Sequence, residues 1–544
     1  MKRFFCVSVF LIILLCSCAA AEDVELMNRY DLAPSGEAVI NDVRFYGDSG
    51  VNDLNRVFYE IFVGSFSDGD GDGTGDLRGI INRLDYLNDG DPASGLSLGV
   101  EGLWLTPVFR SPSYHKYDVT DFYEIDPVFG TQEDLKELID ACHQRGMLII
   151  LDLPINHTGK QNRWFKSFVN AHVMKNTSSP YYDFYTWIEE DAQAPAGRIF
   201  VKEPSSKIKY EANFSESMPE LNFDDPFVRQ SVLEVAQHYI ALGVDGFRFD
   251  AAKYIYLGDN ARSVDFWQWY IGELKKTKPD LYTVAEVWDG EGIISKYQKC
   301  TNCFNFTLSQ ISGMIAETAK AGDVNRFTAY IQKYCDRLKN ANDQAMSVLF
   351  ISNHDMDRAA GYLTVSSGNM KVAANLYLLS PGSPFIYYGE EIGMRGSRGS
   401  ANTDANRRLA MLWGDGDTVQ DPTGTTYDKA NQTPYTVQDL YPQADGMYNY
   451  YKRLLMIRKA NPEIARGEYT VLQLKDTKVG GFLCSWQGQT AAVLHNTTGR
   501  TMTVDIAVAT DVRFTEISAV IGQGNATLEG TKLTLEGQTC VVLR

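Results

Sequence analysis

The chain has 544 residues, of which 44% are hydrophobic, 12% aromatic and 22% charged, and its formal net charge is −18. This apolar content can offset the conformational entropy lost on folding, which excludes an intrinsically disordered protein. The acidic balance argues against nucleic acid as the main partner, because phosphate backbones are bound by basic surfaces. The length is consistent with one large domain and smaller attachments.

The first residues have the features of an export signal. Two basic residues precede an apolar run over residues 4–15, which is too short to span a bilayer comfortably. The L-C-S-C segment that follows resembles a bacterial lipobox, which makes Cys18 the predicted lipidated first residue of the mature chain. Cleavage near residues 19–21, as in a plain secretory peptide, is the alternative. We therefore expect a signal peptide over 1–17, a lipid-anchored tether over 18–50, and an exported lipoprotein held on a bacterial membrane, at the cell surface or in the periplasm.

From about residue 57, short apolar stretches alternate with stretches in which apolar residues recur at three- and four-residue spacing. The second kind predicts helices over 135–145, 228–242, 266–275 and 447–459. Near-continuous apolar strands need cover on both faces, so eight alternations predict an α/β chain with a closed parallel (β/α)8 barrel of the TIM type. The eight strands are expected at Val57–Val63, Gly102–Thr106, Met147–Leu153, Val244–Phe249, Tyr282–Ala285, Phe304–Leu308, Ser347–Ile351 and Pro384–Tyr388.

Two interruptions of this alternation predict further domains. A polar and aromatic insert over 158–221, after the third strand, is too long for an ordinary loop and is expected to form a small domain B. From residue 466 the sequence changes to short alternating runs with Thr and Gly, which predict a C-terminal antiparallel β-sandwich, domain C, over 466–544. The barrel, domain A, then comprises residues 51–157 and 222–465.

Polar and charged residues gather at the carboxyl ends of four predicted strands. Residues 152–157 read D-L-P-I-N-H, residues 246–250 read G-F-R-F-D, residues 285–288 read A-E-V-W, and residues 353–355 read N-H-D. In a β/α barrel the active site is assembled from these ends. Any one of these acids could instead be the N-cap of the next helix. Four ends that carry acids, His and Arg together point to a functional site.

Converging carboxylates with His and Arg donors suit the cleavage of a glycosidic bond. One acid must protonate the leaving oxygen, and another must stay ionised to attack the anomeric carbon. Arg248 lies two residues before Asp250 on the same strand and therefore on the same side, where its charge favours the ionised acid. Asp250 is the predicted nucleophile.

These four segments resemble the signature regions of the α-amylase family, glycoside hydrolase family 13. Further similar segments are Y-H-K-Y-D at 114–118 and M-P-E-L-N at 218–222, and the resemblance spans roughly residues 55–465. It implies a retaining double displacement, with Asp250 as nucleophile, Glu286 as general acid/base and Asp355 as transition-state stabiliser.

The resemblance also implies a set of substrate contacts around the sugar at the cleavage position. One histidine comes from each of two strand ends, a tyrosine stacks on the sugar ring, and an arginine orients the nucleophile. A third histidine and a second arginine are weaker candidates. One departure lies beside the nucleophile, where many α-amylases have Lys-His and this chain has Lys253-Tyr254, so the contact to the leaving-group sugars stays open. The two strand-end histidines are His157 and His354, the stacking tyrosine is Tyr117 and the orienting arginine is Arg248. The weaker candidates are His115 and Arg358.

A Gly-rich loop after the first strand has the pattern of a cation site. The sequence D-x-D-x-D-x-T-x-D over 68–76 places oxygen atoms at every second position, as a hard cation requires. A solvated acidic turn is the alternative. The loop resembles the calcium loop of oligo-1,6-glucosidases and related amylases, which implies a structural Ca2+ at Asp68, Asp70, Asp72, Thr74 and Asp76.

The residue after the nucleophile bears on specificity. Ala251 resembles the α-1,4-cleaving members of the family, so the resemblance implies an α-amylase whose substrates are α-glucans, namely starch and maltodextrin. A neopullulanase or cyclomaltodextrinase, or an α-glucosidase, is the alternative within the family. A non-catalytic sugar-binding lipoprotein is the alternative from another class.

Overall fold

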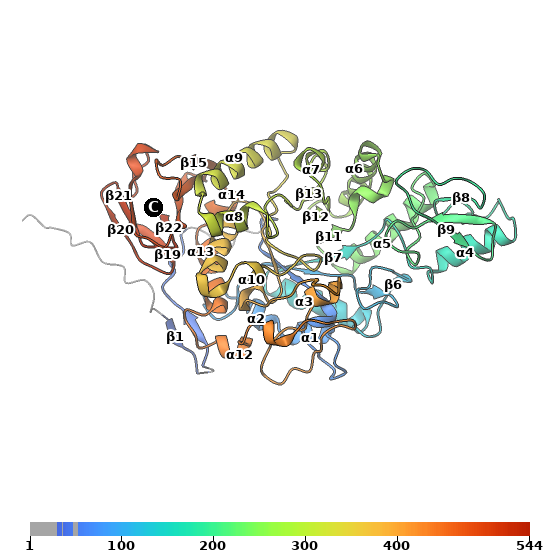
Figure 1. Ribbon diagram of the computed structural model, residues 1–544, viewed down its shortest axis with the longest axis horizontal. Coiled ribbons are helices and arrows are strands. Elements are labelled where there is room, and N and C mark those ends of the chain that lie inside the picture. Colours follow the sequence, from blue (N-terminus) through green and yellow to red (C-terminus); the bar gives the residue numbers. More distant parts are fainter. Residues whose placement is uncertain (1–29, 35, 47–52) are drawn as a thin grey trace, which may run out of the picture.

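The computed structural model describes residues 30–34, 36–46 and 53–544, so the predicted signal peptide and Cys18 lie outside the described residues. The insert and the C-terminal domain lie at opposite ends of an elongated molecule, with the barrel between them (Figure 1). Among the described residues, none of the helices combines the length and the apolar character that a membrane crossing requires.

A curled parallel sheet forms the wall of the barrel, and the predicted TIM-type fold is confirmed. Most of its strands are buried along their whole length, which explains why they read as continuous apolar runs rather than as alternating ones. In spatial order the strands are β13 (Asn302–Cys303), β12 (Tyr282–Ala285), β11 (Gly246–Phe249), β7 (Leu148–Leu153), β4 (Gly102–Leu105), β3 (Phe58–Ile61) and β14 (Phe385–Tyr387).

The sixth expected strand, Phe304–Leu308, is wrong in position. The strand β13 precedes it, and only Phe304 continues the pairing, as a single bridge. The Leu308 N–H donates to the Asn305 carbonyl oxygen at 3.2 Å, which turns the chain. Phe304, Phe306 and Leu308 are nevertheless buried. Their alternation therefore imitates a strand although it belongs to a turn.

The seventh expected strand, Ser347–Ile351, is present only as a bridging segment. Val348 forms an isolated parallel bridge with Phe304. On the other side the Phe385 N–H donates to the Leu349 carbonyl oxygen at 2.8 Å. These bonds connect β13 to β14 and close the barrel, but they are too few to form a regular ladder.

Helices pack around the sheet, and the four predicted helices are confirmed within α3, α5, α6 and α13. Capping residues determine where the helix α5 begins and where it ends, shortly before β11. The Asp225 side chain caps the helix, Pro226 occupies its first turn, and Gly243 ends it with φ 111°, which suits glycine. The barrel helices are α1 (Leu77–Asn82), α2 (Leu84–Leu87), α3 (Gln132–Gln144), α5 (Pro226–Leu242), α6 (Asn260–Thr277), α7 (Glu291–Tyr297), α8 (Met314–Ala321), α9 (Val324–Ala341), α10 (Ala359–Tyr362), α11 (Asn369–Leu378), α12 (Val437–Leu440), α13 (Met447–Ala460) and α14 (Glu463–Arg466).

The insert after β7 folds as a small antiparallel sheet with one helix. Trp164, Phe165 and Phe168 of that helix are buried in its core. His157, directly after β7, forms a bridge with Glu220 at the far end of the insert, so the insert begins and ends beside the site. Its elements are α4 (Arg163–Val173), β8 (Trp187–Glu189), β9 (Phe200–Glu203) and β10 (Ile208–Glu211), and a hairpin of β5 (Phe109–Arg110) and β6 (Asp121–Ile125) precedes it.

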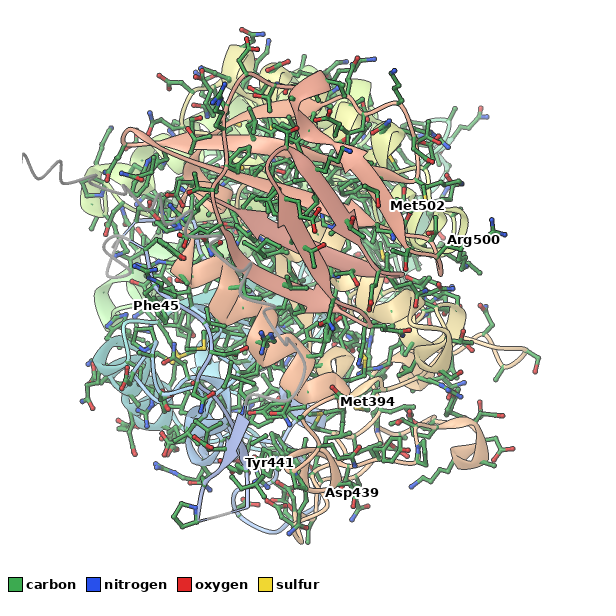
Figure 2. The ribbon with its side chains drawn as sticks, turned by 90° about the vertical axis from the view of Figure 1, so that its left-hand side faces the viewer. Phe45, Met394, Asp439, Tyr441, Arg500 and Met502 are labelled. Carbon is green, nitrogen blue, oxygen red and sulfur yellow. The ribbon has the colours of Figure 1, made fainter. Side chains whose placement is uncertain are left out.

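Two antiparallel sheets form the C-terminal domain, as predicted. Their facing side chains make a second apolar core that includes Leu494, Leu533 and Val541. Figure 2 shows these strands lying across one end of the molecule. One sheet contains β15 (Glu468–Leu472), β16 (Val479–Trp486), β17 (Gln489–Asn496), β22 (Thr539–Leu543) and β19 (Ile517–Gly522), and the other contains β18 (Met502–Asp505), β21 (Lys532–Leu535) and β20 (Ala526–Glu529).

Part of the segment predicted as a tether is docked on the barrel. The strands β1 (Tyr30–Leu32) and β2 (Ala38–Ile40) form a hairpin in which Ala38 and Ile40 are buried. The Ala38 N–H donates to the Tyr441 carbonyl oxygen at 2.9 Å, and Figure 2 places Tyr441 beside this hairpin. The described part of the predicted tether therefore includes a hairpin that packs on the barrel.

Candidate active site

A buried arginine lies at the centre of the strand ends. Arg248 is fully buried on β11, where it pairs in register with Asp152 of β7. Its Nη1 donates to Asp152 Oδ1 at 2.9 Å and also to Asp250, while its Nη2 donates to Glu286 Oε2 at 2.9 Å. Because Asp250 and Glu286 share one guanidinium, their carboxylates stay close together. Retaining glycosidases require this proximity, with the two acids roughly 5 Å apart.

The chain turns sharply directly after the predicted nucleophile. Ala251 has φ 45° and ψ 43°, a left-handed conformation that is uncommon for residues other than glycine. In this conformation its N–H donates to Glu286 Oε2 at 3.0 Å. The strained turn therefore helps to position the predicted acid/base.

The two central acids have raised pKa values. Burial raises the pKa of Asp250 to about 6, although the charge of Arg248 opposes the shift. Burial likewise raises the pKa of Glu286 to about 7, with Arg248 opposing and Asp250 adding to the shift. Of the two acids, Glu286 has the higher pKa, which favours Asp250 as the ionised nucleophile and Glu286 as the protonated general acid.

Asp355 lies in a different electrostatic environment. Its Oδ1 is 2.8 Å from Arg408 Nη2, and its Oδ2 is 3.2 Å from His354 Nε2. Burial alone would raise the pKa of Asp355, but His354, Arg408 and Arg248 outweigh it and hold that pKa well below its usual range. Asp355 therefore stays anionic over the working pH range.

The predicted aromatic and imidazole contacts meet at Tyr117. Its hydroxyl donates to Asp152 Oδ2 at 2.9 Å, and its ring stacks on that of His354 with centroids 5.6 Å apart. The His157 Nε2 donates to the Tyr117 carbonyl oxygen at 3.2 Å, and His115 Nδ1 accepts from the Tyr117 N–H at 3.1 Å. Burial lowers the pKa of both His115 and His157 to about 4, so both rings are neutral.

Arg358, the second predicted arginine, has the surroundings of a structural residue. It is 2% exposed, and its guanidinium donates to the carbonyl oxygens of Tyr388 and Arg407 and lies over two tyrosine rings. These bonds hold Arg358 against the loop that follows β14, although it also lines the cavity that contains Asp355. The contacts described above connect the other predicted site residues, namely Asp250, Glu286, Asp355, Tyr117, His157, Arg248, His354 and His115.

Two site residues were missed at the sequence level. Glu60 Oε1 lies 2.6 Å from His354 Nδ1, and Arg408 contacts Asp355 as described. The signal for Glu60 was available, because it is the one acid in the apolar run F-Y-E-I-F of the first strand. Arg408 lies in a long loop with no recognisable pattern.

Exposed aromatic rings flank the acids. A cavity of about 740 Å³ is lined by both Asp355 and Trp288, and the 42% exposed Trp288 stacks on Phe306 with centroids 5.0 Å apart. Within the insert, Phe214 is 45% exposed and packs against Tyr254 with centroids 4.5 Å apart and the ring planes tilted by 44°. Exposed ring faces of this kind offer flat apolar surfaces to a ligand.

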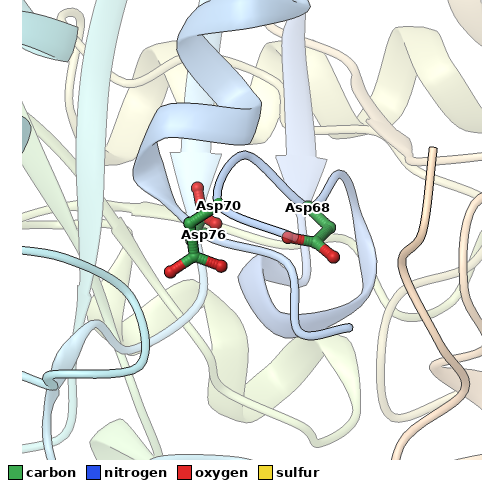
Figure 3. Close-up of side chains that lie close together, drawn as sticks. All are labelled: Asp68, Asp70 and Asp76. Atoms are coloured by element: carbon green, nitrogen blue, oxygen red, sulfur yellow. The ribbon is translucent and has the colours of Figure 1, made fainter. Parts of the chain in front are cut away.

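The loop after β3 contains an acidic cluster. Carboxylate oxygens of Asp68, Asp70 and Asp76 lie within 4.8 Å of one another (Figure 3). Asp72 lies outside this cluster, and its carboxylate accepts from the Thr74 N–H at 2.6 Å. Thr74 stays a predicted ligand. Burial raises the pKa of Asp76, and the charges of Asp70 and Asp68 add to the shift. A hard cation would offset this repulsion, so the three carboxylates fit a candidate metal site.

Comparison with known proteins identifies the family. The family model described as alpha amylase, catalytic domain, matches residues 60–467. The chain belongs to the alpha-amylase family. It is therefore a glycoside hydrolase or transferase of that family, as the strand-end motifs predicted.

Several members of the alpha-amylase family are similar over most of this chain. Alpha-amylase 3 of Dictyoglomus thermophilum is 36% identical over 446 residues, or 81% of this chain and 84% of that protein. The 4-alpha-glucanotransferase of Thermotoga neapolitana is 30% identical over 451 residues, or 80% of this chain and 95% of that protein. The structure of Eubacterium rectale Amy13B matches with a TM-score of 0.83 and 31% identity, covering 92% of this chain and 97% of that one.

The paired acids predict a bell-shaped pH profile of kcat/KM. Activity should fall below about pH 6 as Asp250 is protonated, and above about pH 7 as Glu286 loses its proton. In Glu286→Gln, an aryl α-maltoside whose phenol leaves without protonation should still be attacked, and the alkaline limb should be absent. Initial rates from pH 4 to 9 measure both profiles, and an unchanged alkaline limb in the variant would contradict the assignment.

Proposed function

We propose that this protein is a retaining α-amylase that cleaves α-1,4-glucosidic bonds of starch and maltodextrins. The observation that carries the proposal is the pair Asp250 and Glu286 on one guanidinium, beside an Asp355 that contacts Arg408 and His354. This arrangement supplies an ionised nucleophile, a protonated acid and a second negative charge for an oxocarbenium-like transition state.

The reaction proceeds in two displacements. Asp250 attacks the anomeric carbon while Glu286 protonates the glycosidic oxygen, so the bond to the leaving sugar breaks and a glycosyl ester forms on Asp250. Glu286, now a carboxylate, takes a proton from water, and the resulting oxygen nucleophile displaces Asp250 from the anomeric carbon. Two inversions retain the configuration at that carbon.

Three observations support cleavage within α-1,4-linked chains. The small side chain of Ala251 follows the nucleophile, as in the family members that cleave this linkage. The cavity that Asp355 lines extends toward Trp288 and the loop after β14, so it has room for a glucan chain. The similar protein from Dictyoglomus thermophilum bears the name alpha-amylase.

Transfer of a glucan to a second sugar is the other candidate. Phe214 contacts both Tyr254 and His157, with ring centroids 4.5 and 5.4 Å apart, so an exposed ring lies beside the predicted sugar contacts. A ring surface beside the site favours a bound sugar as acceptor over water. The similar protein from Thermotoga neapolitana is named a 4-alpha-glucanotransferase.

Two further properties belong to the proposal. Ca2+ binds at Asp68, Asp70 and Asp76, where it stabilises the loop between β3 and α1. The chain is exported and anchored to a bacterial membrane through lipidated Cys18, which brings the enzyme to glucans outside the cytoplasm.

Products of soluble starch distinguish the candidate activities. With protein that lacks residues 1–18, we expect mixed maltodextrins early in the reaction, no cleavage of isomaltose, and loss of activity in Asp250→Asn. Chromatography of a time course, with pullulan and isomaltose in parallel, is the measurement. Panose from pullulan at a comparable rate would indicate a neopullulanase, glucose alone an α-glucosidase, and chains longer than a maltotriose substrate a transferase. Binding without any cleavage would contradict the enzyme assignment.

Calcium removal should lower stability more than it changes the chemistry. Chelation should lower the thermal midpoint of the wild type, and added Ca2+ should restore it, because bound ligand stabilises the folded state. Asp68→Asn should lower the midpoint and weaken the response to chelation, whereas Asp72→Asn, outside the cluster, should respond like the wild type. Calorimetry with and without chelator measures this, and a wild type that does not respond would contradict the calcium site.

A further inference from the structure

Glu60 is a buried acid that the reaction steps above do not use. It is 1% exposed in the interior of the barrel, and its Oε1 accepts from His354 Nδ1 at 2.6 Å and from the His354 N–H at 3.3 Å. A buried carboxylate is costly unless hydrogen bonds and an opposite charge compensate it. Both of these donors come from His354, a predicted substrate contact.

The other nitrogen of the same ring also faces acceptors. His354 Nε2 lies 2.7 Å from the Tyr117 hydroxyl and 3.2 Å from Asp355 Oδ2. The Tyr117 hydroxyl has an acceptor in Asp152 Oδ2 at 2.9 Å, and an ionised Asp355 can only accept, so both contacts of Nε2 are satisfied when Nε2 carries a proton. A neutral imidazole has only one N–H, whereas these contacts require an N–H at both Nδ1 and Nε2 of His354.

We propose that Glu60 is a positioning residue that keeps His354 as an imidazolium, so that a positive charge stays beside Asp355 and the sugar hydroxyls during turnover. The catalytic consequence rests on the proposed function, but the charge state of His354 does not.

Other charges around the ring act in both directions. Burial and the charge of Arg408 lower the pKa of His354, while Asp355 and Glu60 raise it, and the net direction is upward from the ordinary value of 6.5. Without the charge of Glu60, Asp355 and the more distant Asp152 would oppose burial and Arg408. The charged and titratable groups near this ring are Glu60, Tyr117, Asp152, Asp355, Arg248, Arg407 and Arg408.

The direct test is the protonation of His354 in the wild type. The chain has seven histidines, so 15N-histidine labelling gives few ring signals, and the one missing in His354→Gln identifies the residue. We expect both ring nitrogens to be protonated at pH 7, where an ordinary histidine is mostly neutral. A neutral His354 at pH 7 would overturn the inference. This titration needs no substrate, so it is independent of whether starch is cleaved.

Glu60→Gln tests the role of the carboxylate, because glutamine keeps the size and one acceptor oxygen but removes the charge. We expect His354 to become neutral at pH 7 and kcat/KM to fall by about tenfold or more. The ratio of variant to wild-type activity should rise as the pH is lowered and His354 regains its proton. A merely structural defect would instead give a constant ratio across pH, which would overturn the proposed role.

Glu391→Gln is the matched control. Glu391 is also a fully buried acid of the barrel, but its carboxylate accepts from the hydroxyls of Tyr59 and Tyr86 rather than from a site residue. This variant should leave the pH profile and the His354 signals unchanged. If Glu60→Gln does not fold, as judged by circular dichroism, the titration of the wild type still decides the charge state.

Discussion

The pairing of Arg248 with three carboxylates is the constraint on which the site depends. A fully buried guanidinium is tolerated only when acids neutralise it, and carboxylates crowded at one end of a barrel are tolerated only beside a cation. The acids therefore neutralise Arg248, and Arg248 in turn reduces the repulsion among the acids. Because the acids come from β7, β11 and β12, the register of these strands and the geometry of the site are determined together.

Unequal distribution of positive charge lets three acids do different work at one pH. Arg248 alone faces Asp250 and Glu286, so burial prevails and their pKa values rise. Asp355 additionally faces His354 and Arg408, and its pKa falls. The site can therefore hold an ionised nucleophile, a protonated acid and a permanent anion. In the proposed role, Glu60 acts from the interior of the barrel by keeping His354 protonated.

The sequence predicted what local rules determine. Strand ends in a β/α barrel converge, so the order of residues along the chain was enough to place Arg248, Asp250, Glu286 and Asp355 together. The turn at residues 304–308 could not be recognised, because an alternation of buried apolar residues looks the same in a strand and in a turn packed on a core.

Residues that act through long-range contacts were harder to predict. Arg408 reaches Asp355 across 53 positions from an irregular loop, and Glu60 reaches His354 across 294. In the loop after β3 the spacing of oxygen atoms predicted the cluster of Asp68, Asp70 and Asp76, but it did not show that Asp72 lies outside this cluster.

We propose that Asp250 forms a covalent glycosyl ester while Arg248 holds it beside Glu286. Mass spectrometry of the protein can detect this ester after reaction with a fluorinated maltosyl fluoride, from which the ester forms readily but hydrolyses slowly. We expect one added glycosyl group on the peptide that contains Asp250, and none in Asp250→Ala. A label on Asp152 or Asp355, or steady turnover of starch with no labelled intermediate, would contradict it.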